Sequence, residues 1–398
     1  MVRAVKNGDN VTSGATDLAQ REHMETMTQH HGYRFETLAV KGGIELEPGD
    51  EVAPPIHLSA TFVNPGATEL RLNYARSGGP GYDVLEKVLA QLEGGNDAVV
   101  FNAGQAVLVA ILADLPAGST VVMPTQTYFG FKLFVDEFAP RFGLTIRTVE
   151  QADLQAVGQA LNGAALLWVE TPTNPTMEVA DLAAIGALAA AKGVPWVCDN
   201  TFASPVLQRP LDFGAMVSLH SVTKYIAGHS DLILGVGIVK DLELSARLRK
   251  RRSSFAVQPD GFSCWLARRG IQTLPLRVKH QCAAAMEIAT RLSKHPGVAQ
   301  VYYPGLPTHP GHEIAASQMK GGFGGMLSFL TVDPEAAVQI PFRCKVWVPG
   351  TSLGSVESLI ERRARWAGEE VDPRLLRLSV GVENVEDLWE DLDQAIRG

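Results

Sequence analysis

The sequence predicts an α/β protein with a mainly parallel, seven-stranded sheet, followed by a smaller α+β domain. Short apolar runs alternate with helical segments between residues 98 and 239, a pattern typical of parallel strands joined by crossover helices. The pattern changes at residues 258–261, where the sequence QPDG indicates a turn. The chain has 398 residues, which is too long for one ordinary core and favours two domains.

The strands expected in the first sheet are short, apolar and bounded by turn residues. They comprise residues 98–101, 120–123, 144–149, 166–170, 194–199, 215–219 and 232–239. Helices are expected between them, at residues 83–93, 106–112, 130–142, 153–161 and 181–192. Ligands of open parallel sheets bind at the carboxyl ends of the strands. The residues that follow these strands are therefore candidates for a binding site.

The rest of the chain is expected to flank this sheet. Residues 1–33 are polar and aperiodic, which predicts a loosely ordered segment. The predicted division is an N-terminal arm (1–67), a large domain (68–258) and a small domain (259–398). In the small domain we expect a helix at 274–295, strands at 298–303, 321–330, 344–349 and 375–380, and a final amphipathic helix that ends near residue 396.

Composition excludes several classes of protein. Hydrophobic residues make up 46% of the chain and charged residues 20%, as in globular proteins. The net charge of −8 gives no electrostatic footprint for nucleic acid, and we interpret the basic run at 247–252 as a solvated helix face. No apolar stretch approaches eighteen residues, so we expect no membrane span, and we expect no secretory signal.

The four cysteines do not form a CxxC pair, which argues against a zinc ribbon and against a disulfide framework. We expect reduced thiols in a cytoplasmic protein. His30 and His31 are adjacent, but a histidine pair in a polar tail is usually incidental, so we predict no metal site.

The apolar run at 215–219 is followed by Ser221, Thr223 and Lys224. A lysine is rarely buried unless it is paired or has reacted. Burial lowers its pKa and frees its lone pair for Schiff-base chemistry, and the two hydroxyls could hold a phosphate. A carbonyl cofactor with a phosphate group, pyridoxal phosphate, fits both features. The alternative is a surface turn with a solvated lysine.

Other strand ends carry residues that suit the same cofactor. Asp199 ends an apolar strand and could hold a protonated ring nitrogen, whereas Tyr128 could stack on a flat ring. Glu170 and Asn174 lie in ETPTNP, after another strand. Each has a plainer alternative: Asp199 as a helix cap, Asn174 as a turn residue and Tyr128 as part of the core. Their joint occurrence at successive strand ends favours a binding site.

Two loops could bind a phosphate. Asn102-Ala103-Gly104-Gln105 joins a strand to a helix, a layout that directs backbone N–H groups at an anion. It is not GxGxxG, so a Rossmann dehydrogenase is less well supported. Tyr74 and Arg76 lie in a glycine-rich loop and could grip a phosphate or belong to a surface turn. Arg377 interrupts the apolar strand LLRLSV, where it could bind a substrate carboxylate or form an internal ion pair.

From about Phe35 to the C-terminus, the chain resembles the cystathionine γ-synthase/β-lyase family of pyridoxal-phosphate enzymes, the Cys/Met metabolism family. The resemblance is carried by motifs in the family's order: APPIHLSATF, YARSGGPG, LEKVLAQLEGG, ETPTNP, DNTFASP, HSVTKYIAGHSDLILG, YPGLPTHPGH, GGMLSF, SLGSVESLI and LRLSVGVEN. It implies an aspartate-aminotransferase-like fold (fold type I) and usually a homotetramer built from two tight dimers.

The resemblance also implies a role for each site residue. Lys224 would bind the cofactor covalently, Asp199 would contact its pyridine nitrogen, and Tyr128 would stack on its ring and shuttle protons. Asn174 would contact the phenolic oxygen, and Ser221, Thr223, Gly104 and Gln105 would bind the phosphate. Tyr74 and Arg76 would reach the phosphate of the neighbouring subunit. Ser352 and Arg377 would bind the substrate carboxylate.

The implied activity is that of a carbon–sulfur lyase, acting by β- or γ-elimination on cystathionine or a related sulfur amino acid. Its products would be a keto acid, ammonia and a thiol. The alternative is a γ-replacement enzyme that joins cysteine or sulfide to an activated homoserine. A cofactor-binding module without turnover is a third possibility, which the intact Lys224, Asp199, Tyr128 and Arg377 argue against.

Several positions depart from the family pattern. Gly79 and Gly81 replace the usual Asn and Thr of GNPT, which is expected to loosen that loop. FGFKL follows Tyr128 where many members have GGT. Thr351 stands where γ-synthases and γ-lyases often have Glu, and this difference favours elimination over replacement. After ESLI, the histidine-proline motif that is commoner in the family is replaced by ERRARWAGEEVDP.

Overall fold

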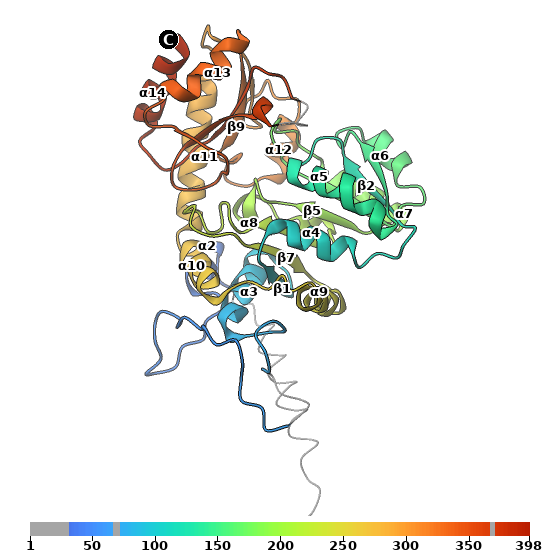
Figure 1. Ribbon diagram of the computed structural model, residues 1–398. Coiled ribbons are helices and arrows are strands. Elements are labelled where there is room, and N and C mark those ends of the chain that lie inside the picture. Colours follow the sequence, from blue (N-terminus) through green and yellow to red (C-terminus); the bar gives the residue numbers. More distant parts are fainter. Residues whose placement is uncertain (1–31, 67–71, 367–370) are drawn as a thin grey trace, which may run out of the picture. The chain divides into compact units, whose positions relative to one another are not determined.

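A computed structural model describes residues 32–66, 72–366 and 371–398 (Figure 1). Residues 35–398 form one compact unit. Most of the segment predicted to be loosely ordered, and with it His30 and His31, lies outside the described residues. The division of the chain at residues 67 and 258 into an arm and two domains stays a prediction.

The first sheet has seven strands in the order β1-β7-β6-β5-β4-β2-β3. All neighbouring strands are parallel except β7, which runs antiparallel to both β1 and β6. The predicted mainly parallel sheet is therefore confirmed. Its strands are β1 (Asp97–Phe101), β2 (Thr120–Pro124), β3 (Thr145–Val149), β4 (Leu166–Glu170), β5 (Trp196–Asp199), β6 (Val217–Ser221) and β7 (Gly235–Val239).

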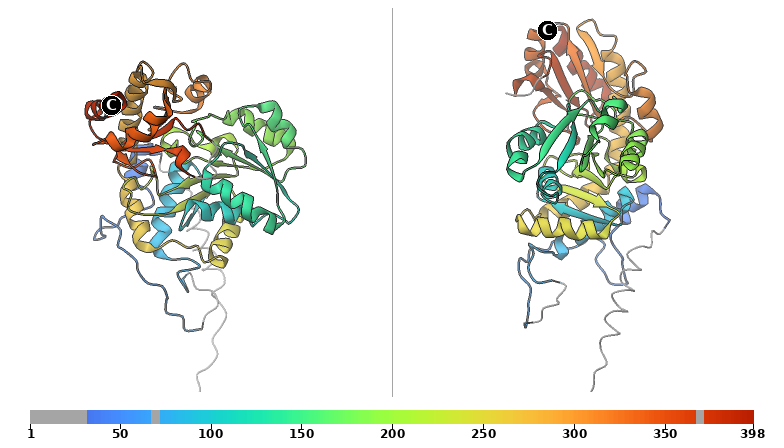
Figure 2. Two further views of the ribbon diagram at one scale, coloured as in Figure 1. Left: turned by 45° about the horizontal axis from the view of Figure 1, so that its top comes forward. Right: turned by 90° about the vertical axis from the view of Figure 1, so that its right-hand side faces the viewer.

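Helices cover both faces of this sheet (Figure 2). Successive strand residues point to opposite faces, so Val100 packs in one apolar cluster and Val99 in another. The first cluster includes α3 (Pro80–Glu93), α6 (Leu154–Ala160) and α7 (Leu182–Lys192), and the second includes α4 (Gly104–Leu112), α5 (Phe129–Phe138) and α9 (Leu242–Ser254). The shorter helices of this half are α2 (Phe35–Lys41), η1 (Ala139–Phe142), α8 (Ser204–Leu207) and η2 (Pro210–Phe213).

Proline and glycine explain where two of these helices begin and end. Helix α3 starts at Pro80, earlier than expected, because proline fits the first helical turn. It ends at Gly94, whose φ of 75° is the left-handed conformation that closes helices. The helix predicted at 130–142 divides into α5 and the 3₁₀ helix η1, since Pro140 lacks the N–H that a continuous α-helix would need.

The second sheet has five strands in the order β10-β11-β12-β9-β8. Apolar residues of its strands pack with three helices around Phe329 and Trp347. The strands are β8 (Val298–Tyr302), β9 (Met326–Thr331), β10 (Val348–Pro349), β11 (Leu359–Arg362) and β12 (Leu375–Ser379). The helices of this half are α10 (Gly261–Ile271), α11 (Leu274–Leu292), α12 (His312–Gln318), α13 (Pro334–Arg343), η3 (Arg363–Arg365) and α14 (Val385–Arg397).

The strand predicted at 344–349 is wrong over most of its length, because only residues 348 and 349 join the sheet. The Asp391 carboxylate accepts hydrogen bonds from the backbone N–H groups of Lys345, Val346 and Trp347 at 2.9, 2.7 and 3.1 Å. A carboxylate in helix α14 thus satisfies the donors that a strand would have used for pairing.

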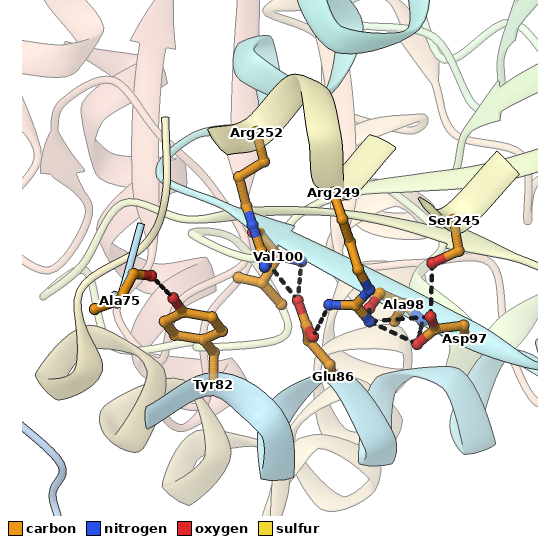
Figure 3. Close-up of polar contacts among 9 residues, drawn as sticks. All are labelled: Ala75, Tyr82, Glu86, Asp97, Ala98, Val100, Ser245, Arg249 and Arg252. Atoms are coloured by element: carbon orange, nitrogen blue, oxygen red, sulfur yellow. Dashed lines mark hydrogen bonds and ion pairs between the residues drawn. The ribbon is translucent and has the colours of Figure 1, made fainter. Parts of the chain in front are cut away.

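The basic run at 247–252 is only partly the solvated face that we expected: Arg247 and Lys250 are exposed, but Arg249 and Arg252 point into the protein (Figure 3). Arg252 is fully buried and donates from Nη1 to Glu86 Oε1 at 2.7 Å and to the Val100 carbonyl at 3.0 Å. Arg249, on the same face of α9, donates to Glu86 Oε2 at 2.6 Å and to Asp97 at 2.8 Å. These ion pairs join helices α9 and α3 to strand β1.

The four cysteines are free thiols. Cys198, Cys264 and Cys282 are buried and Cys344 is partly buried, and burial raises the pKa of each thiol. Among the described helices, we find no membrane-spanning candidate, since none combines the necessary length with sufficient apolar character.

Candidate active site

A cavity of about 310 Å³ lies at the carboxyl ends of the central strands, and residues of the C-terminal half, among them Ser352 and Arg377, complete its wall. Its volume is within the range of small-molecule sites. The structure brings ten of the twelve predicted site residues to its wall: Gly104, Gln105, Tyr128, Asn174, Asp199, Ser221, Thr223, Lys224, Ser352 and Arg377.

Lys224 follows strand β6 and projects its amine into this cavity. Its Nζ donates a hydrogen bond to Ser352 Oγ at 2.8 Å. Burial, and then the nearby Arg377 guanidinium, lower the pKa of the Lys224 amine from 10.5 to about 8. A substantial fraction of the amine is therefore neutral near physiological pH, as a nucleophile or base requires.

This pKa predicts how the amine reacts with pH. In protein freed of cofactor, the rate of Lys224 acetylation by acetic anhydride should rise with pH, with a midpoint near pH 8, because only the neutral amine is nucleophilic. Peptide mass spectrometry of samples quenched between pH 6 and 11 measures this rate, with N-acetyl-lysine amide as the reference. A midpoint near 10.5 would contradict the prediction.

Two carboxylates lie side by side at the ends of β4 and β5, where Glu170 pairs with Asp199 in the strand register. Asp199 accepts a hydrogen bond from the Thr201 backbone N–H at 3.0 Å. Burial raises the pKa of Asp199, and burial together with the Asp199 charge raises the pKa of Glu170. A cation in the cavity would favour the ionised form of Asp199, so this side chain suits a protonated ring nitrogen.

Glu170 holds two neighbouring parts of the site together. Its Oε2 accepts hydrogen bonds from the Thr127 hydroxyl and the Tyr128 N–H, each at 2.7 Å, and its Oε1 accepts from the Asn174 N–H at 2.9 Å. We identified Glu170 in the sequence only as a strand end. Its part in positioning the backbone of Tyr128 and Asn174 depends on loops that the sequence pattern does not place.

Tyr128 precedes helix α5, and its ring is 41% exposed at the cavity wall. The ring packs edge-on against Phe131, with a centroid distance of 5.3 Å. Gly130 makes room for it, because a Cβ atom at that position would lie 2.6 Å from Tyr128 Cε1. Burial raises the pKa of the phenol, and the Arg363 guanidinium opposes that rise.

The N-terminus of helix α4 opens onto the cavity through Ala103, Gly104 and Gln105. Ala103, the N-cap residue, makes no side-chain capping hydrogen bond. The first turn therefore presents its backbone N–H groups and the positive end of the helix dipole without a protein carboxylate or hydroxyl as cap. With the Ser221 hydroxyl, which lies beside Gly104, this arrangement suits a phosphate group.

Two predicted phosphate ligands make other contacts in this structure. The Thr223 hydroxyl donates to the Leu234 carbonyl at 3.1 Å and accepts from the Leu234 N–H at 3.0 Å. Gln105 Nε2 donates to the Gly130 carbonyl at 2.8 Å, which ties helix α4 to the start of α5. Both residues support the cavity wall, and their roles as phosphate ligands stay predictions.

Of the two alternatives for Arg377, the structure shows the internal ion pair, and binding of a substrate carboxylate stays a prediction. Arg377 lines the cavity, and its Nη2 donates to Glu361 Oε2 at 2.8 Å and to the Ser352 carbonyl at 3.0 Å. Its Nη1 donates to Asn174 Oδ1 at 3.0 Å. The internal ion pair is thus present, and it fixes the guanidinium beside the residue that contacts Lys224.

Sequence reasoning missed Glu361 and Arg363. Arg363 is 4% exposed, lines the cavity and donates to Glu361 Oε2 at 2.7 Å. Glu361 also accepts from Arg365 and from the Trp366 indole N–H. The only signal in the sequence was the departure ERRARW after ESLI, where we recognised an anomaly without assigning it a function.

Tyr74 and Arg76 do not line the cavity of their own chain. Tyr74 is 48% exposed, and the Arg76 guanidinium lies 5.5 Å from the centre of its ring. The Tyr82 hydroxyl donates to the Ala75 carbonyl between them (Figure 3), and the Ala75 N–H donates to the Ala60 carbonyl at 2.9 Å. The loop that we expected to be loosened by Gly79 is therefore anchored from helix α3.

The residues at this cavity fit pyridoxal phosphate: a partly buried lysine of lowered pKa, a carboxylate for a ring nitrogen and an uncapped helix N-terminus for a phosphate. Elsewhere, within residues 32–66, 72–366 and 371–398, no cluster of three or more His, Cys, Asp or Glu side chains is arranged to hold a metal ion. The fold and the cavity thus define an enzyme class that binds a phosphate-bearing carbonyl cofactor through a lysine.

Comparison with known proteins identifies the family. A family model described as Cys/Met metabolism PLP-dependent enzyme matches residues 36–397. A cystathionine γ-synthase of Mycobacterium tuberculosis is 42% identical over 386 residues, which cover 94% of this chain and 99% of that protein. A cystathionine γ-lyase of Dictyostelium discoideum is 38% identical over 385 residues, covering 93% and 99% respectively.

Solved structures agree with this result. The crystal structure of metB from Corynebacterium glutamicum superposes with a TM-score of 0.89 at 37% identity, covering 92% of this chain and 98% of that one. The chain belongs to the Cys/Met metabolism family of pyridoxal-phosphate-dependent enzymes. The predicted family, fold class and cofactor are confirmed.

Proposed function

We propose that this enzyme cleaves a carbon–sulfur bond of cystathionine or a related sulfur amino acid, releasing a keto acid, ammonia and a thiol. The observation that carries the proposal is the Lys224 amine, whose pKa is lowered to about 8 and which lies 2.8 Å from Ser352 Oγ in a cavity that Arg377 also lines. An amine in this state can remove a proton from the α-carbon of an amino acid.

The other cavity residues would hold the cofactor and orient the substrate. When bound, pyridoxal phosphate supplies an electron sink for the carbanion formed by proton removal. Asp199 would hold its ring nitrogen, Asn174 its phenolic oxygen, and the start of helix α4 with Ser221 its phosphate. Arg377 and Ser352 would orient the substrate carboxylate, and the Tyr128 phenol would stack on the ring and carry protons between substrate atoms.

A second candidate function is γ-replacement, in which cysteine or sulfide displaces the leaving group of an activated homoserine. The 42% identity to a cystathionine γ-synthase favours it. Thr351, at the cavity wall, favours β-elimination, because family members that act at the γ-carbon, both γ-synthases and γ-lyases, often carry Glu there. The chemistry up to removal of the α-proton is shared by both functions.

A product assay tests the proposal. The purified holoenzyme is incubated with cystathionine alone, and with O-succinyl-L-homoserine plus cysteine. Release of pyruvate or 2-oxobutyrate with ammonia from cystathionine supports elimination and distinguishes β- from γ-cleavage. Formation of cystathionine without keto acid would show that the enzyme catalyses γ-replacement and is not a lyase. No turnover of any sulfur amino acid would refute both proposed functions.

We also propose that the enzyme acts as a homotetramer of two tight dimers in the cytoplasm, with active sites shared across each dimer. The position of Tyr74 and Arg76 outside their own cavity supports a contribution to the neighbouring site. Four free thiols are consistent with a reducing compartment. Light scattering of the purified enzyme tests the oligomeric state.

A shared site predicts complementation between two inactive variants. In a mixed dimer of Lys224→Ala and Arg76→Ala chains, one site would combine an intact Lys224 with an intact Arg76. Random pairing after co-expression should then restore about a quarter of the wild-type activity. Each variant alone is the control, and co-expressed chains with no more activity than the separate variants would contradict the shared site.

A further inference from the structure

Two arginines lie side by side at the cavity wall. Arg377 of strand β12 faces Glu361 of strand β11 in the antiparallel register, and Arg363 follows directly after β11. Both guanidinium groups donate to the same oxygen, Glu361 Oε2, at 2.8 and 2.7 Å. Because Glu361 and Arg377 belong to paired strands, the two cations are held in place by the sheet.

Both guanidinium groups are buried and both line the cavity. A guanidinium is charged at any physiological pH, and its planar donors match the oxygens of carboxylates and phosphates. The place of Arg377 beside Ser352, whose hydroxyl contacts Lys224, matches it to the α-carboxylate of an amino acid. A second arginine in the same wall therefore indicates a second anionic group on the ligand.

We propose that Arg363 is a specificity-determining residue that binds a second anionic group, at the end of the substrate side chain, while Arg377 binds the α-carboxylate. The inference rests on the function proposed above and narrows its substrates to amino acids whose side chain ends in a carboxylate.

The contacts of the two arginines support this division. Arg377 donates to the carbonyl of Ser352, whose hydroxyl contacts the Lys224 amine, so Arg377 lies near the amine that must reach the α-carbon. Among charged neighbours, Arg377 has the larger effect on the pKa of Lys224, whereas Arg363 has the larger effect on that of Tyr128. Arg363 therefore acts on both groups, since its charge also lowers the pKa of Lys224, and it is the stronger of the two arginines at Tyr128.

The test compares substrates that differ by one carboxylate. For γ-elimination the pair is O-succinyl-L-homoserine and O-pentanoyl-L-homoserine; for β-elimination it is S-(2-carboxyethyl)-L-cysteine and S-butyl-L-cysteine. The wild-type holoenzyme should prefer the acidic member. Arg363→Gln should lower kcat/KM for the acidic member by about 10- to 100-fold and change the neutral member less than about threefold. Arg363→Lys should have a kcat/KM for the acidic member between those of the wild type and Arg363→Gln.

Arg365→Gln is the matched control, because Arg365 also donates to Glu361 but does not line the cavity. It should leave the acidic-to-neutral ratio unchanged. An equal loss for both substrates in Arg363→Gln, or a wild type without acidic preference, would overturn the proposal, as would an Arg365→Gln variant that loses the preference to the same extent.

A binding experiment separates this inference from the proposed function. Calorimetry measures the Kd of glutarate and of pentanoate, which have equal length, for the holoenzyme. Arg363→Gln should weaken glutarate binding by about 10-fold or more and leave pentanoate unchanged. This result would support the anion site even if the enzyme turned over no sulfur amino acid. Equal Kd changes for both ligands would refute it.

Discussion

Replacing Lys224 by alanine is expected to lower the rate of keto-acid release by about 10⁴-fold or more, because one amine supplies both the covalent link to the cofactor and the base for the α-proton. The absorbance band of lysine-bound cofactor should disappear in the same variant. Coupled assays of keto acid and spectra of the purified protein measure both effects.

Lys240→Ala is the matched control for this substitution. Lys240 is exposed and donates to the Leu211 carbonyl at 2.9 Å, but it does not line the cavity. It should keep the cofactor band and most of the activity. If Lys224→Ala retained more than a small fraction of wild-type turnover, another group would have to be the base, and the proposed function would lose its main support.

Replacing Glu86 by alanine is expected to lower the free energy of unfolding by about 3–5 kcal/mol, because it leaves the fully buried Arg252 without its carboxylate. It also removes the acceptor of the Val100 N–H, at 2.8 Å, and one contact of Arg249. Urea denaturation at a fixed protein and cofactor concentration measures the change.

Asp136→Ala provides the comparison for an exposed ion pair, since Asp136 contacts Lys132 at 2.6 Å on the surface of α5. It should have little effect on stability, because exposed pairs contribute little. Glu86→Leu, which fills the space without a charge, should still be destabilising because Arg252 remains buried. A Glu86→Ala variant as stable as Asp136→Ala would show that Arg252 finds another partner or becomes solvated.

The sequence predicts the catalytic half of the cavity well because that half follows a simple rule. Lys224, Asp199 and Tyr128 each come at or after the end of a strand, and the carboxyl ends of the parallel strands meet at one edge of the sheet. Alternation of strands and helices was enough to bring them together, and the structure places all three at one cavity.

The sequence does not predict what depends on pairing between distant segments. Glu361 meets Arg377 through an antiparallel register, and the position of Arg363 follows from that pairing. Arg252 resembles any other arginine of a basic helix, and only the position of Glu86 on α3 explains its burial. Asp391, in the last helix of the chain, likewise limits strand β10 to two residues, because its carboxylate accepts the hydrogen bonds of the backbone just before the strand.

Ser352 has one further consequence. Its φ of 91° places a residue other than glycine in the left-handed region, which costs of order 1–3 kcal/mol. Glycine there would relieve that cost but would remove the hydroxyl that contacts Lys224. Selection of this enzyme for heat resistance alone would therefore favour a change that weakens catalysis, so stability and activity compete at a single atom of the active site.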